Sequence, residues 1–223
     1  MSSRLRVFDT SVGTKLLIGV TGLFLVVYMI IHIAGNAVFL FGPNMFNAYA
    51  DVLGGNPLIP IIEIVLLVAF LVHIYKTVRM FLENQQARPV GYAQKRRAGP
   101  PSRKNLASTT MIVTGLWLVI FLVIHVRTFR FSEHPHTEAG IIDLYRVETE
   151  ALASPLALAF YAISMLIIGS HLWHGVASAF QSLGFDHPRW TPRLITFGKA
   201  FAVVVAGGFI VIAVFAHLAG ANQ

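Results

Sequence analysis

The sequence predicts an all-α integral membrane protein, a single-domain bundle of five transmembrane helices. The chain of 223 residues is 56% hydrophobic and only 12% charged, with a mean hydropathy of +0.69, which is too apolar for an ordinary soluble domain. It contains five apolar runs, each long enough to supply the roughly 20 residues that a helix needs to cross a bilayer. Polar segments rich in charge, glycine and proline separate these runs.

The first two runs cover about residues 15–41 and 57–82. A basic N-terminus before an apolar run also fits a cleaved signal peptide, but this run is too long and lacks an A-x-A cleavage pattern, so we expect a retained helix. Between the runs, residues 42–56 contain turn-forming Pro43 and three glycines, and their apolar residues recur at helical spacing. This pattern predicts a short interfacial amphipathic helix.

The remaining runs cover about residues 106–126, 155–180 and 194–218. Residues 83–105 form a polar, basic connection between the second and third runs. A long polar stretch, 127–154, follows the third run, and we assign no helix to it. The whole chain, residues 1–223, is therefore one membrane domain with no internal repeat of fixed period.

The lysines and arginines predict the orientation of the bundle. Five spans place the two termini on opposite sides, and 14 of the 17 basic residues fall on the side of the N-terminus. Because basic residues are enriched on the cytoplasmic side, we expect the N-terminus in the cytoplasm and the C-terminus outside. The net charge of +7 therefore indicates membrane orientation rather than binding to nucleic acid.

An ionisable ring inside an apolar run is costly and usually functional. Among the six histidines inside the apolar runs, we single out four, one in each of the first four runs: His32, His73, His125 and His171. With a rise of about 1.5 Å per residue, His32 and His125 lie roughly 25 and 28 Å from the cytoplasmic edge. His73 and His171 each lie roughly 24 Å from the opposite edge. The histidines therefore sort into an outer pair and an inner pair, each from helices that run in the same direction.

Two bis-histidine haems stacked across the membrane fit these pairs. The chain has no cysteine, which excludes structural disulfides, thiolate-held iron–sulfur clusters and covalent haem attachment within it. One histidine in an apolar helix is more often a packing residue, but four at matched depths favour haem ligation. His174 shares roughly the face of His171 and is an alternative ligand, or a partner for a propionate, the backbone or a quinone.

Other polar residues at membrane depth have two interpretations. Glu63 either accepts a quinol proton near the outer haem or is an interfacial residue bonded to a helix N-terminus. Four cations near the two faces either pair with haem propionates or extend to the interface as ordinary snorkelling side chains. These cations are Lys15, Lys76, Arg79 and Arg127.

Several stretches of the sequence match a known family. They are Ser11-Val12-Gly13-Thr14-Lys15 with Thr21-Gly22, His32 before Gly35-Asn36, His73 before Lys76 and Arg79, His125-Val126-Arg127, and His171-Leu172-Trp173-His174-Gly175 before Ser178-Ala179-Phe180-Gln181-Ser182-Leu183-Gly184. From about Ser11 to the fifth helix, the chain resembles the dihaem cytochrome b membrane anchor of succinate:quinone oxidoreductases, the single-subunit five-helix type. The resemblance implies ligand pairs from helices one and three and from helices two and four, and it favours His171 over His174.

The resemblance also implies partners. A flavoprotein would oxidise succinate and an iron–sulfur protein would pass electrons to this anchor on the cytoplasmic side of a bacterial inner membrane, so the chain itself would hold no succinate-oxidising site. Menaquinone is the usual quinone of dihaem anchors, and Ser11, Thr14 and Trp173 are candidate quinone contacts by family position. A higher oligomer of the complex is compatible with this resemblance.

Two alternatives remain at the level of sequence. One is the haem cytochrome b of another quinone-linked enzyme, such as formate dehydrogenase or hydrogenase. The other is a haem-free transporter that uses the histidines as a proton relay. That transporter would need acidic partners at the histidine depths, where Glu63 is the candidate that the sequence offers.

Overall fold

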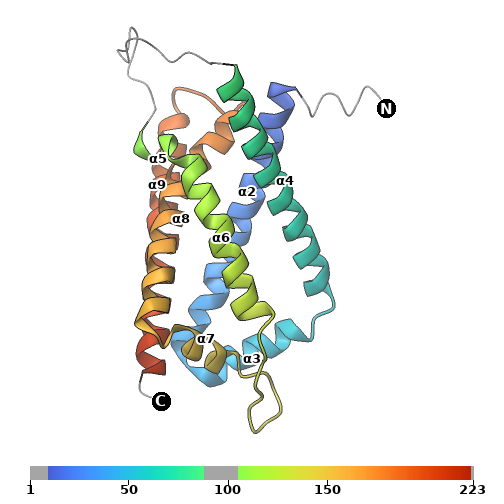
Figure 1. Cartoon of the computed structure of the whole chain (residues 1–223), viewed down its shortest axis with the longest axis vertical. Coiled ribbons are helices and arrows are strands. Elements are labelled where there is room, and N and C mark those ends of the chain that lie inside the picture. The colour runs from blue at the N-terminus through green and yellow to red at the C-terminus, as the bar shows by residue number, and fades with distance from the viewer. Residues whose placement is uncertain (1–9, 88–104, 222–223) are drawn as a thin grey trace.

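The protein is a helical bundle with five spans (Figure 1). The computed structural model describes residues 10–87 and 105–221, and in them the extended structure is limited to one isolated bridge between His136 and Ile142. Arg4, Arg6 and the basic cluster of residues 88–104 lie outside the described residues. The prediction of an all-α membrane protein is confirmed, because five described helices are long and apolar enough to cross a bilayer.

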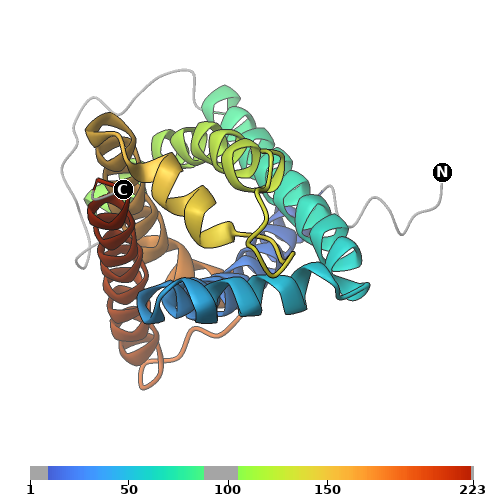
Figure 2. The same cartoon turned by 90° about the horizontal axis from the view of Figure 1, so that it is seen from below.

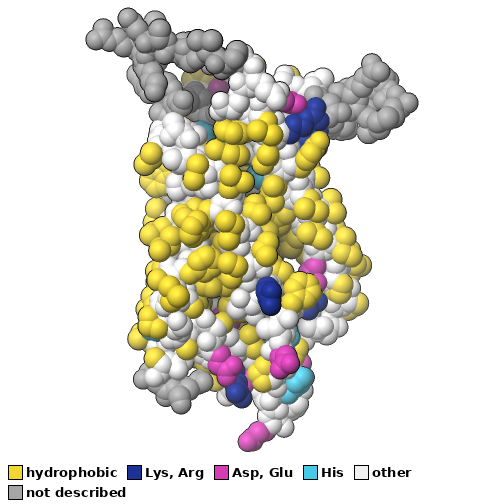
Figure 3. All heavy atoms as spheres, in the orientation of Figure 1, with side chains coloured by type: hydrophobic (Ala, Val, Ile, Leu, Met, Phe, Trp, Pro, Cys, Tyr) yellow, Lys and Arg dark blue, Asp and Glu magenta, His cyan; other side chains and the backbone are white. Residues whose placement is uncertain are grey.

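The five spans agree with the apolar runs to within a few residues. They are α2 (Ser11–Ala37) with its 3-10 extension η1 (Val38–Phe41), α4 (Leu58–Gln86), α6 (Met111–Arg130), α8 (Pro155–Ser182) and α9 (Thr191–Gly220). Exposed apolar side chains cover the middle of the bundle, and charged side chains gather toward its ends (Figure 3). This surface is suited to a hydrocarbon layer.

The third span departs most from its predicted bounds. Residues 106–109 form a separate single turn, α5 (Leu106–Thr109), which Asn105 caps by accepting a hydrogen bond from the Ser108 amide at 2.8 Å. The span itself begins at Met111 and continues to Arg130 instead of ending near residue 126. The last turn of this helix carries two basic residues, Arg127 and Arg130, and basic residues at this end interact favourably with the helix dipole.

Two short helices lie together at one end of the bundle, which we call the α3–α7 end (Figure 1). The predicted interfacial helix is present as α3 (Pro43–Gly54). The polar stretch 127–154 contains an unpredicted helix, α7 (Leu144–Leu152), which Asp143 caps. Asn47 of α3 joins the two by donating to the Asp143 carboxylate at 2.8 Å and accepting from the Tyr145 amide at 2.9 Å.

Four spans form a ring, and the fifth packs outside it. Going around the ring, α2 packs on α4 and α8, and α6 packs on α8 and more weakly on α4 (Figure 2). Consequently α2 faces α6 across the bundle, and α4 faces α8. Helix α9 covers α8 and α2, and Gly169 lets α8 approach it so closely that an added Cβ would lie 3.0 Å from Ala206.

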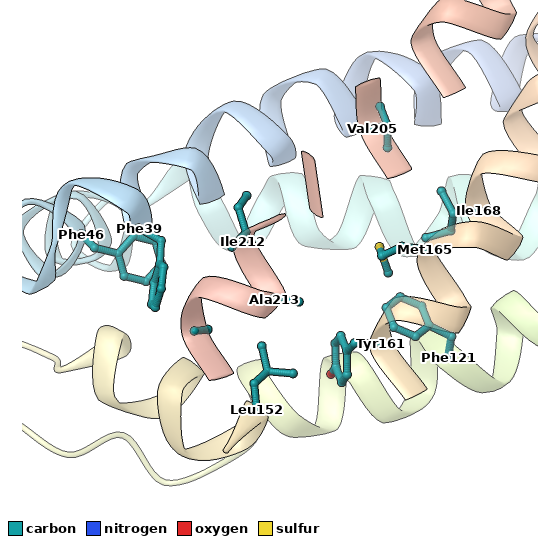
Figure 4. Packing of buried hydrophobic residues seen from close by; sticks show 11 residues of the cluster. Phe39, Phe46, Phe121, Leu152, Tyr161, Met165, Ile168, Val205, Ile212 and Ala213 are labelled. Carbon is teal, nitrogen blue, oxygen red and sulfur yellow. The ribbon is translucent and has the colours of Figure 1, made fainter. Parts of the chain in front are cut away.

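The hydrophobic core lies mainly toward the α3–α7 end (Figure 4). Phe121 of α6 and Tyr161 of α8 meet there with ring centroids 5.4 Å apart, and Leu152 of α7 lies beside Tyr161. The first residues of α2 lie at the opposite end of the bundle, so the chain begins and finishes its spans on different sides.

Candidate functional site: two pairs of histidines

His32 and His125 meet across the diagonal between α2 and α6. Their ring centroids are 5.9 Å apart, and the ring planes are nearly perpendicular, at 88°. Each histidine lies five residues before the last residue of its α-helix, Ala37 or Arg130, so the two rings reach the same level. The structure thus brings together the two residues that the sequence predicts as one pair.

Aromatic side chains surround this pair. Tyr28 stacks on His32 at 5.2 Å, and Phe209 of α9 lies 5.5 Å from the same ring. Phe121 and Phe129 flank His125 at 5.4 and 5.1 Å. Such a shell excludes water from the faces of the imidazoles and orients them by packing.

The hydrogen bonds of the His32–His125 pair are long or absent. The Tyr28 hydroxyl and the Asn36 amide nitrogen are each 3.4 Å from Nδ1 of His32, which is long for a hydrogen bond. Nδ1 of His125 is buried and has no hydrogen-bond partner within the described residues. A buried polar atom without a partner usually marks missing water, an ion or another bound group.

The second pair is His73 and His171, on the facing helices α4 and α8. Nδ1 of His73 is 3.1 Å from the hydroxyl oxygen of Thr21 in α2. That hydroxyl already donates to the Leu17 carbonyl at 2.7 Å, so its oxygen accepts the proton of Nδ1. The hydrogen-bond network thereby leaves a lone pair on Nε2, which is the form of histidine that binds a metal.

His171 repeats this arrangement with α6. Its Nδ1 is 3.1 Å from the hydroxyl oxygen of Thr114, which donates to backbone carbonyls one turn earlier at 3.0–3.1 Å. His73 and His171 also lie close enough to interact electrostatically. The Thr114 contact selects His171 as the inward-facing ring and leaves His174 half-buried beside it.

A glycine follows each threonine and makes room for the imidazole. A Cβ added at Gly22 would lie 3.3 Å from Cε1 of His73, and one added at Gly115 would lie 3.6 Å from Cε1 of His171. The pattern Thr-Gly followed eleven residues after the threonine by histidine therefore occurs twice, at Thr21 and at Thr114. Sequence analysis missed this correspondence, although the spacing was visible.

The same spacing separates the two levels. Eleven residues of helix rise by about 16 Å, and they lead from Thr21, bonded to His73, to His32 on the same helix. The same count leads from Thr114, bonded to His171, to His125. The described residues contain no group of three or more His, Cys, Asp or Glu side chains suited to a metal.

These residues fit a haem iron at each level. In the part of the chain that the structure describes, Nε2 of His73 and of His171 makes no hydrogen bond, and the His32–His125 separation would let both imidazoles reach one metal ion through metal–nitrogen bonds of about 2 Å. Facing helices of a bundle are the usual location of such sites. The unpartnered Nδ1 of His125 also fits a site that is completed by a bound group.

The predicted propionate partners lie in different environments. Lys76, one turn after His73, is only 9% exposed, and its ammonium lies 5.9 Å from the centre of the Tyr75 ring. Arg79 pairs with Glu83 at 2.7 Å. Lys15 and Arg127 are exposed. Of these cations, Lys76 is the one that the fold buries in the bundle.

The predicted quinone residues do not form one site. Glu63 lies toward the α3–α7 end and makes a two-pronged ion pair with Arg130 of α6 at 2.7 and 3.2 Å, a partner that neither interpretation of the sequence foresaw. Ser11 is exposed, and Thr14 is only 2% exposed; both lie in the first turns of α2, at the opposite end of the bundle. Trp173 faces the Lys199 ammonium at 5.4 Å and lines a pocket of about 270 Å³ beside α5.

The fold and the paired imidazoles define a class: a multi-pass helical membrane protein with two diagonal histidine pairs at separate depths. No family model matches the chain, and no curated protein matches its sequence significantly. The function must therefore be inferred from the residues and their geometry.

Proposed function

We propose that this protein is the dihaem cytochrome b membrane anchor of a succinate:quinone oxidoreductase. The observation that carries the proposal is that four imidazoles meet two by two across the diagonals of one bundle. Imidazole is a usual axial ligand of haem iron, and facing helices of a bundle commonly build such sites. When bound, each b haem supplies a one-electron carrier inside the membrane.

The residues of the chain bind and orient the two groups. His32 and His125 hold one iron, and His73 and His171 hold the other. Thr21 fixes the orientation of one imidazole of the second pair and Thr114 that of the other, which raises the basicity of these ligands. The buried ammonium of Lys76 is placed to offset the charge of a propionate near His73.

The order of the two haem levels across the membrane follows from the proposed orientation. The excess of lysine and arginine on the side of the N-terminus supports a cytoplasmic N-terminus. The His73–His171 level would then be the nearer one to an iron–sulfur protein that serves a flavoprotein, and His32–His125 would lie near the outer face. A membrane quinone, menaquinone by family resemblance, exchanges electrons with this chain in a bacterial inner membrane.

Haem analysis of the purified complex tests this proposal. A pyridine-haemochrome assay is expected to give two haems per chain, and a flavin-containing succinate-oxidising subunit is expected to co-purify. Two haems with a formate dehydrogenase or hydrogenase partner would favour another quinone-linked enzyme. A complete lack of haem would favour the transporter and end the proposal.

A further inference from the structure

Buried polar atoms without partners gather near the α3–α7 end. Within the described residues, five buried side-chain atoms lack a hydrogen-bond partner, and four of them belong to His125, Ser132, Thr137 and Tyr161. The ring centroids of His125 and Tyr161 are 6.2 Å apart. Thr128 lies beside the Tyr161 hydroxyl without a well-aligned hydrogen bond. Such a cluster indicates bound water, because buried polar groups in proteins are nearly always satisfied.

A buried carboxyl group belongs to the same cluster. Glu148 of α7 is 8% exposed and interacts electrostatically with Tyr161. Its carboxylate has no hydrogen bond or ion pair within the described residues. Glu150, two residues later, is instead exposed and pairs with Arg146 at 2.6 Å. Burial raises the pKa of Glu148 to about 8.

A surface pocket provides access to this cluster. It has a volume of about 520 Å³ and lies between α6 and α7, where Thr128 and Ser132 line it together with Val147. Val147 is the neighbour of Glu148 in the chain, and Thr128 lies beside Tyr161. Water in the pocket therefore reaches the residues that surround the buried carboxyl group.

On the basis of the proposed function, we propose that Glu148 is the proton-exchanging group of the His32–His125 haem site. When one electron reaches the iron at that level, supplied by a quinol or by the iron–sulfur partner, the Glu148 carboxylate takes one proton from water in the pocket. One O–H bond forms on the carboxylate, and one O–H bond of a hydronium ion or water molecule in the pocket breaks, which leaves water or hydroxide there. When the electron leaves, the carboxylic acid returns its proton to water. The added negative charge favours the neutral acid, because charges interact strongly in a medium of low dielectric constant.

The other ionisable groups around α7 do not replace Glu148 in this role. His217 of α9 donates to the Leu152 carbonyl at 2.8 Å, so its Nδ1 proton is already engaged. Burial alone accounts for the raised pKa of Glu148, with no contribution from a neighbouring charge. The helices packed against α7, and α7 itself, also carry Tyr49, Asp51, His125, Arg127, Arg130, Tyr145, Arg146, Glu150, Tyr161, His171, His174, Arg193 and Lys199.

Redox titration of the purified complex at several pH values tests the proposal. We expect the midpoint potential of one of the two haems to fall by up to about 59 mV per pH unit above about pH 8, where Glu148 is ionised before reduction; 59 mV is the equivalent of a tenfold change for one electron. Glu148→Gln should abolish this pH dependence and leave the other haem unchanged. Glu150→Gln is the matched control and should keep the pH dependence. An unaltered slope in Glu148→Gln overturns the proposal.

A second measurement covers the case in which Glu148→Gln fails to assemble. The reduced-minus-oxidised infrared spectrum of the wild-type complex should contain a carboxylic acid band that shifts when glutamate is isotopically labelled. Absence of that band overturns the proposal. If the preparation holds two haems and Glu148→Gln leaves the pH dependence of their potentials unchanged, this inference alone is contradicted. A preparation without haem contradicts the proposed function itself.

Discussion

The two histidine levels are built differently. At the His73–His171 level, a threonine hydroxyl of the neighbouring helix accepts a hydrogen bond from each imidazole at 3.1 Å. At the His32–His125 level, the polar neighbours of His32 are 3.4 Å away, and Nδ1 of His125 has no partner within the described residues. Aromatic packing, rather than hydrogen bonding, holds the His32–His125 level.

This difference indicates two kinds of site. Hydrogen bonds to the outer nitrogen of a ligand fix its tautomer and its ring orientation, so the His73–His171 level is pre-organised. Tyr161 links the His32–His125 level to the buried carboxyl group of Glu148, since its ring lies 6.2 Å from that of His125 and it interacts electrostatically with Glu148. We therefore expect this level to depend on water and on protonation. We expect the midpoint potential of the His73–His171 haem to resist changes of pH and that of the His32–His125 haem to respond to them.

Removal of a ligand gives the largest expected effect. His171→Ala should lower the haem content from two to one per chain, because one axial ligand of that iron is lost, and His32→Ala should do the same at the other level. His174→Ala is the control and should keep both haems. Haem content of the purified variants is the measurement; two haems in His171→Ala would contradict the ligand assignment.

The buried acid gives the next effect, on stability. An acid whose pKa rises from 4.5 to about 8 on folding is protonated in the folded state and ionised in the unfolded state between those values. Stability should therefore fall as pH rises through this range, by roughly 3–6 kcal/mol in total, and level off above it. Glu148→Gln should remove most of this slope in thermal melts of the detergent-solubilised complex, whereas Glu150→Gln should retain it. Parallel slopes in both variants would refute the assignment.

The threonines should give an intermediate effect that separates the two levels. Thr21→Val and Thr114→Val keep the side-chain shape but remove the acceptor, so each should weaken haem retention by about 10–100-fold. Tyr28→Phe should have a smaller effect, because its hydroxyl is 3.4 Å from His32. Haem dissociation rates provide the measurement, with Thr21→Ser and Thr114→Ser as controls. If Thr21→Val, Thr114→Val and Tyr28→Phe all weakened haem retention equally, the distinction between the two levels would be refuted.

The smallest effect is expected at the surface near the α3–α7 end. Glu63 and Arg130 are 40% and 55% exposed, so Glu63→Gln should change stability by less than about 1 kcal/mol. It should also leave both haem potentials unaltered, because the charged partner of Glu63 is Arg130. Thermal melts and redox titration measure the two outcomes, and a shifted potential would restore Glu63 as a proton acceptor.

The sequence predicted the spans well and the polar contacts less well. Five runs were visible because hydropathy over some twenty residues is insensitive to the exact ends of a helix. Helix α7 was missed because its sequence is polar, and its burial of Glu148 depends on helices distant in the chain. The partner of Glu63 was missed for the same reason, since Arg130 is 67 residues away.

The histidine pairing was accessible from the sequence because helix rise converts residue numbers into depth. The roles of Thr21 and Thr114 were accessible too, since each precedes a histidine by eleven residues and is followed by glycine. What the sequence lacked was the rotation of each helix about its axis. That rotation decides which side chains meet, as in the choice between His171 and His174.

The haem content of the purified, intact chain tests the central claim most directly. Pyridine-haemochrome analysis, combined with a redox-titrated optical spectrum, is expected to give two b-type haems per chain that reduce as two components, one of them sensitive to pH. A chain that is folded in the membrane and carries no haem would contradict the claim that these four imidazoles bind iron.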